Sequence, residues 1–132
     1  MPLTITALTA SALAILLVLL AILTIQQRMK YRVPFGDGEK QPLIAAIRAH
    51  ANLAEYMPIG ITLIALLEGG PHNPYILGGL AIVFVVTRLL NAIGLFAPPG
   101  PPGPARSIGI VGTLLVLLGL AVWLAARTLG LV

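Results

Sequence analysis

The feature that most constrains this chain is a run over residues 2–25 that contains no charged side chain. Crossing the hydrocarbon core of a bilayer takes about 20 residues of apolar helix, so this run predicts a membrane span. Three further apolar stretches follow, and the predicted spans cover residues 2–27, 42–68, 74–96 and 105–127. Only 9% of the residues are charged, whereas soluble domains carry about 25%. The sequence therefore predicts an all-α integral membrane protein with a single four-helix transmembrane domain of residues 1–132.

The segments between the predicted spans have the composition of loops. Gly36, Asp37 and Gly38 predict a tight turn, which we prefer to a metal ligand or general base at Asp37. The segment from Ala97 to Pro104 is rich in proline and glycine and predicts a stiff loop. Basic residues follow the first span instead of preceding it, so we expect this span to be retained and not cleaved as a signal peptide.

The basic residues are distributed unequally between the two sides of the predicted membrane. The first and third loops carry most of them: Arg28, Lys30, Arg32, Lys40 and Arg106. The positive-inside rule makes this side cytoplasmic and leaves both termini outside. The net charge of +4 is spread along the membrane flanks, and no basic surface predicts a nucleic-acid partner. The chain has no cysteine, which excludes disulfides, thiolate metal sites and a cysteine nucleophile.

Polar side chains at membrane depth gather in the cytoplasmic half of the spans. The second span carries four of them at helical spacing on one face, while His50 points away; these four are Arg48, Asn52, Glu55 and Tyr56. Arg88 and Asn91 share a face late in the third span, and Arg106 opens the fourth. Ionisable groups at this depth are costly unless they face a bundle interior, a subunit interface or water. The layer is therefore the predicted functional site.

Several arginines set against one glutamate suit a small ligand with excess negative charge and one cationic group. Arginine pairs with carboxylates through two parallel hydrogen bonds, and a glutamate can hold an amine. Glutathione has two carboxylates, one amine and a thiol, so it fits, although other amphipathic acids fit as well. We predict no metal.

Two segments resemble the MAPEG family, the membrane-associated proteins in eicosanoid and glutathione metabolism. They are MKYRVPFGDG at residues 29–38 and AIRAHANLAEYMP at residues 46–58. The resemblance extends to chain length and span count, and it is closest to short bacterial members related to glutathione S-transferase. It implies a left-handed four-helix bundle assembled as a homotrimer in a bacterial inner membrane. It also implies glutathione as co-substrate, bound between subunits in the cytoplasmic half of the membrane.

The resemblance further implies roles for single residues. Positions that hold glutathione match Arg28, Arg48, His50, Asn52, Glu55, Tyr56, Arg88 and, beside it, Asn91. Arg106 matches an arginine that activates the thiol in some members, and Ser107 is the alternative hydrogen-bond donor to that thiol. Asn91 and Leu95 stand where some members have aromatic or histidine side chains, which favours conjugation or peroxide reduction over eicosanoid synthesis.

The predicted function is a membrane-bound glutathione-dependent transferase or peroxidase that acts on lipophilic electrophiles arriving from the bilayer. A second hypothesis is a non-catalytic trimeric membrane protein that binds glutathione or a lipid, with the arginines and Glu55 in interhelical ion pairs. A third is a small transporter or proton relay in which Glu55 and His50 titrate. This third function needs a polar path, and we expect no ionisable group in the outer half of any span.

Overall fold

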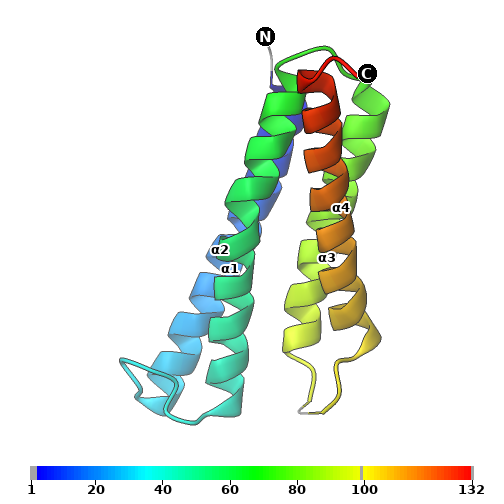
Figure 1. Ribbon diagram of the computed structural model, residues 1–132. Coiled ribbons are helices and arrows are strands. Elements are labelled where there is room, and N and C mark those ends of the chain that lie inside the picture. The colour runs from blue at the N-terminus through cyan, green and yellow to red at the C-terminus, as the bar shows by residue number, and fades with distance from the viewer. Residues whose placement is uncertain (1–2, 99, 132) are drawn as a thin grey trace.

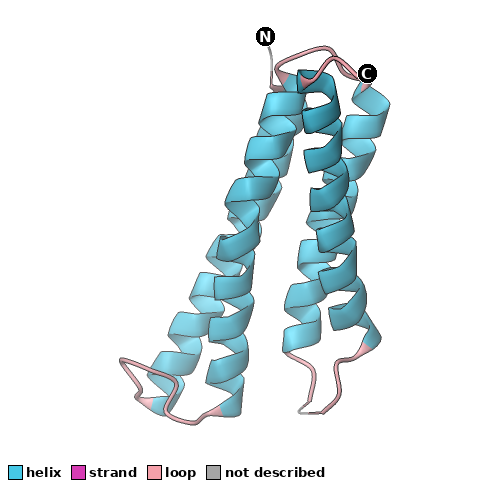
Figure 2. Ribbon diagram, viewed as in Figure 1, coloured by secondary structure: helices cyan, strands magenta, loops and turns pink. Residues whose placement is uncertain are grey.

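The computed structural model describes residues 3–98 and 100–131, and it consists of four helices (Figures 1 and 2). They are α1 (Thr4–Tyr31), α2 (Gln41–Glu68), α3 (Pro74–Leu95) and α4 (Pro104–Thr128). Each is long and apolar enough to cross a membrane. The described residues contain no strand, which confirms the all-α prediction with four long apolar helices.

The helices form two antiparallel pairs, α1 with α2 and α3 with α4 (Figure 1). Both chain termini and the short α2–α3 connection lie at one end of the bundle, here called the terminal end. The two longer connections, 32–40 and 96–103, lie at the opposite end, here called the loop end. The two pairs lie closest together at the terminal end and diverge toward the loop end.

Local sequence explains where the helices begin and end. Proline occupies one of the first two positions of α2, α3 and α4, where its missing N–H is not needed. Asn73 also caps α3 by accepting hydrogen bonds from the backbone N–H groups of Tyr75 and Ile76, at 3.0 and 3.3 Å. The first helix runs to Tyr31 instead of ending near residue 27, because the residues that follow Gln27 favour helix until Arg32 adopts the left-handed conformation, with φ of 56°.

Apolar side chains form a core between the helices while most of the apolar surface faces outward. Leu13, Leu53, Phe84 and Leu120 are at most 2% exposed. The Phe84 ring packs directly on Gly60, where a Cβ would lie 2.2 Å from the ring. Only 17% to 39% of each helix's apolar window is buried within the chain, so the remainder is left for lipid or for other copies of the chain.

Helices α3 and α4 approach each other closely because glycines line their contact. A Cβ at Gly109 would lie 2.5 Å from the backbone nitrogen of Asn91, and one at Gly94 would lie 2.5 Å from that of Arg106. Small residues allow such backbone contact between membrane helices. This close contact fixes the axial position of α4 relative to α3 at the loop end.

Glu68, the last residue of α2, is buried at the terminal end and caps α1. Its carboxylate accepts hydrogen bonds from the backbone N–H groups of Ile5 and Thr6 and from the Thr6 hydroxyl, each at 2.7 Å. These N–H groups have no partner within their own helix. The expectation of no ionisable group in this half of the membrane is therefore wrong, since Glu68 is only 5% exposed. Its oxygens are engaged in the helix cap.

Arg127 caps the carboxyl end of α2 itself in the complementary way. Its guanidinium donates hydrogen bonds to the carbonyl oxygens of Leu66, Leu67 and Pro71, at 2.6, 2.8 and 3.2 Å. The last carbonyls of a helix carry partial negative charge, so a cation there is stabilising. The terminal end is thus held together by one acidic and one basic helix cap.

Candidate functional site

The structure separates the predicted site residues into three groups. The first is a buried cluster around Arg88, which includes Asn52 and Tyr56. The second is a pocket at the loop end, lined by Arg48 and Arg106. The third group lines neither, and it comprises Arg28, His50, Glu55, Asn91 and Ser107.

Arg88 is 3% exposed and links three helices. From α3, its Nη1 donates to Asn52 Oδ1 on α2 at 2.9 Å, and its Nε donates to Thr113 Oγ1 on α4 at 2.8 Å. Its Nη2 donates to the carbonyl oxygen of Gly109 at 3.1 Å. The ring of Tyr56 lies against the guanidinium, with 4.8 Å between Cζ and the ring centroid. Arg88 is thus an interhelical clasp. Its charge is stabilised by neutral hydrogen-bond acceptors and by the face of an aromatic ring.

Thr113 and Thr87 complete this cluster, and sequence reasoning missed both. Thr113 Oγ1 lies 2.8 Å from the Gly109 carbonyl oxygen and 3.0 Å from Thr87 Oγ1, and its single hydroxyl proton can serve one of them at a time. Thr87 in turn donates to the carbonyl oxygen of Phe84 at 2.9 Å. Arg88 and Thr113 lie at similar distances from the α3–α4 connection, so antiparallel pairing sets them at one level. This similar distance from the connection could have identified Thr113 as a neighbour of Arg88 from the sequence.

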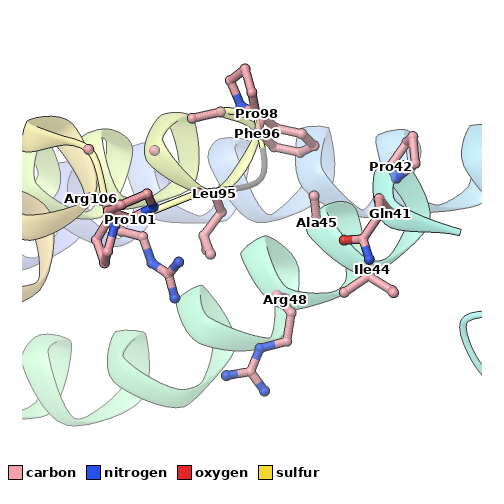
Figure 3. Close-up of a pocket in the computed structure, with 15 residues that line it drawn as sticks. Gln41, Pro42, Ile44, Ala45, Arg48, Leu95, Phe96, Pro98, Pro101 and Arg106 are labelled. Carbon is pink, nitrogen blue, oxygen red and sulfur yellow. The ribbon is translucent and has the colours of Figure 1, made fainter. Parts of the chain in front are cut away.

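A pocket of about 420 Å³ opens at the loop end, between the start of α2, the end of α3 and the start of α4 (Figure 3). Its apolar wall comes from α2, from the end of α3 and from the proline-rich connection, and includes Pro42, Ile44, Ala45, Leu95, Phe96, Pro98 and Pro101. The proline-rich segment, predicted as a stiff loop, thus contributes a wall of the pocket. The pocket lies where the two helix pairs diverge.

Arg48 on α2 and Arg106 on α4 give this pocket its charge (Figure 3). The described residues that line it include no acidic side chain. Arg48 is exposed, and Arg106 is half-buried. The Nε of Arg106 is buried without a hydrogen-bond partner among the described residues. Two guanidinium groups with no acidic side chain beside them in the described lining suit the pocket to an anionic ligand.

Glu55 and His50 lie on α2 but outside the pocket lining. Glu55 is exposed, and neither its side chain nor that of Arg48 has a hydrogen bond or an ion pair with any residue in the described ranges. The ion pairs between the arginines and Glu55 that the second hypothesis invokes are therefore not formed among the described residues of one chain. His50 is half-buried, away from the face that carries Arg48.

Three further candidates are held in other surroundings. Arg28 Nη1 donates to the carbonyl oxygen of Gly36 at 2.9 Å and has longer contacts with two other carbonyls of the first loop, so within one chain it braces that loop. Asn91 is buried where its backbone packs on Gly109. Ser107 is exposed on α4 and does not line the pocket.

The four apolar helices and the buried polar cluster define an integral membrane protein with a basic pocket at one end of its bundle. The sequence profile of the MAPEG family matches residues 6–126. The chain is also 36% identical, over 90 residues, to the inner membrane protein YecN of Escherichia coli strain K12, covering 68% of this chain and 69% of that protein. YecN of Escherichia coli O6:H1 matches with the same identity and coverage. The chain belongs to the MAPEG family.

Proposed function

We propose that the protein binds glutathione at its loop end and transfers it to lipophilic electrophiles that enter from the bilayer. The observation that carries this proposal is the pocket lined by Arg48 and Arg106, with no acidic residue among its described lining. Membership of the MAPEG family supports the choice of glutathione among amphipathic anions.

Each group of the site has a role that suits one part of the ligand. Arg48 pairs with a carboxylate of glutathione, and Glu55, exposed two turns further along the same helix, holds the amine. Arg106 lies at the thiol and favours the thiolate, the nucleophilic form. The thiolate sulfur attacks the electrophilic carbon and forms the C–S bond. The leaving group departs with the bonding electrons, and the thiol proton passes to water.

A second copy of the chain completes this site. Arg48 and Glu55 are exposed in one chain although they lie on a helix that crosses the membrane, and charges facing lipid are costly. Covering them with a neighbouring subunit removes that cost and encloses the ligand. We propose a homotrimer in the inner membrane, with loops 32–40 and 96–103 on the cytoplasmic side. The basic residues near the loop end support that orientation.

Turnover of glutathione with an activated aryl chloride tests the activity. The product thioether absorbs in the near ultraviolet, and detergent-purified wild type should form it faster than the uncatalysed reaction does. Arg106→Ala should slow this formation, while Lys30→Ala, which removes an exposed charge from the end of α1, should not. Glutathione binding without turnover would leave the non-catalytic binding protein as the function. One observation favours that second candidate: Ser107, the alternative hydrogen-bond donor to the thiol, does not line the pocket.

A further inference from the structure

The amide of Asn52 can offer a ligand either its oxygen or its NH₂ group, and the structure determines which. Arg88 has five N–H donors and no acceptor, so the amide end that faces it must be the oxygen. The 2.9 Å contact from Arg88 Nη1 does reach Asn52 Oδ1. The NH₂ group of Asn52 is consequently left on the other side of this half-buried amide.

Arg88 can impose this orientation because it is itself held in place. Its Nε is bonded to Thr113 and its Nη2 to the Gly109 carbonyl, both on α4, and its plane lies against the ring of Tyr56. Thr113 is 1% exposed, and its hydroxyl is bonded within the same cluster. A guanidinium fixed by two bonds to α4 cannot turn to follow the amide. The amide must instead adapt to the guanidinium.

We infer that Arg88 and Thr113 are positioning residues that make Asn52 a pure hydrogen-bond donor toward the bound ligand. The group on glutathione that meets Asn52 is then an acceptor oxygen, either a carboxylate or a peptide carbonyl, and not an N–H group. This inference rests on the proposed function, since it concerns the same ligand. It assigns Arg88 a role that acts through Asn52 instead of through contact with glutathione.

A change of Asn52 to aspartate separates this role from a structural one. Aspartate has nearly the same shape and keeps an acceptor for Arg88, so the clasp between α2 and α3 is retained. It presents an oxygen where the NH₂ group was. Asn52→Asp should therefore preserve thermal stability and weaken glutathione binding by about tenfold or more, because an acceptor then faces an acceptor. Unchanged affinity would contradict the inference.

A double-mutant cycle tests whether Arg88 acts through Asn52. Calorimetric titration with glutathione is compared for wild type, Arg88→Lys, Asn52→Ala and the double variant. Arg88→Lys keeps the positive charge but loses the planar guanidinium and its fixed N–H donors. It should weaken glutathione binding by about tenfold in the wild-type background and hardly at all when Asn52 is already alanine. Additive losses would mean that Arg88 does not act through Asn52.

Thr113 provides a milder variant should Arg88→Lys fail to fold. Thr113→Val removes the acceptor of Arg88 Nε and should weaken glutathione binding about threefold, and Thr113→Ser should restore it. Thr62→Val is the matched control, because within the described part of the chain the Thr62 hydroxyl is bonded only to its own helix, at the Pro58 carbonyl. Wild type that does not bind glutathione would overturn the proposed function and this inference together. Binding by wild type with Thr113→Val no weaker than Thr62→Val would overturn the inference alone.

Discussion

The arginines of the polar layer differ in what their donors already bind. Arg88 is engaged with neutral groups of two other helices, α2 and α4, and Arg28 is engaged with carbonyls of the first loop. Arg48 and Arg106 line the pocket, and the Nε of Arg106 lacks an acceptor among the described residues. Residue type and spacing could not make this distinction, because it depends on which carbonyls and hydroxyls the fold brings within reach. The pocket arginines are therefore the ones we assign to an anion.

Replacing Arg106 should change the ionisation of bound glutathione. A thiol with a pKa of ~8.5 is only about 3% thiolate at pH 7, and a nearby guanidinium lowers that pKa. Arg106→Ala should raise the pKa of the bound thiol by about two units, a loss of about 2.7 kcal/mol of preferential thiolate stabilisation. Affinity should fall less, because the carboxylate contacts remain. Thiolate absorbance in the ultraviolet, followed against pH, reports this pKa.

Ser107→Ala is the informative companion to that experiment. Ser107 is exposed and outside the pocket lining, so its loss should leave the thiol pKa of bound glutathione unchanged. A shift seen with Ser107→Ala and absent with Arg106→Ala would transfer the activating role to the serine.

Replacing Glu68 should destabilise the terminal end. Glu68→Ala removes the acceptor of the buried N–H groups of Ile5 and Thr6. Leaving buried donors unpaired costs about 1–3 kcal/mol each, so a loss of about 2–6 kcal/mol is expected for the two N–H groups. Thermal unfolding followed by circular dichroism in detergent measures it. Glu39→Ala, in the exposed first loop, should leave the melting temperature unchanged, and equal melting of the two variants would refute the capping role.

At the scale of the helix, sequence pattern predicted the elements well and their contacts poorly. Long apolar runs interrupted by proline and glycine predict membrane helices with little ambiguity, because lipid leaves the backbone few other conformations. The polar stripe of α2 also follows from helical spacing. The role of Thr113 depends on the register between α3 and α4, which no single-helix pattern contains. The cap formed by Glu68 likewise depends on a partner more than sixty residues away.

The glycine contact between α3 and α4 predicts a large difference between two similar substitutions. A Cβ at Gly109 would lie 2.5 Å from the backbone nitrogen of Asn91, whereas one at Gly119 on the same helix meets nothing within 4 Å. Gly109→Ala should lower stability by about 1–3 kcal/mol through overpacking. Gly119→Ala should be neutral or stabilising by up to about 1 kcal/mol, because alanine is the better helix former. Thermal unfolding compares the two, and an equal effect would contradict the close packing.

At the scale of the whole molecule, one chain leaves its site incomplete. The two helix pairs diverge toward the loop end, where Arg48 is exposed, and Glu55 is exposed two turns further along α2. The sequence showed that such charges need cover, yet it could not show what provides it, because the covering surface belongs to another copy. We predict that native mass spectrometry in a mild detergent will find a trimer as the main species. An isologous dimer is the commoner oligomer, and finding one, or a monomer that still binds glutathione, would contradict the intersubunit site.

The central claim, that the basic pocket and the α2 stripe bind glutathione, is tested most directly by calorimetric titration of the purified protein. Wild type should bind one glutathione per chain. Arg48→Ala and Glu55→Gln should each weaken binding by about tenfold or more, since each leaves a ligand charge without its partner. His72→Ala should not change it, because His72 lies in the α2–α3 connection at the terminal end. Equal affinity in wild type and both stripe variants, or no binding at all by folded wild type, would contradict the account.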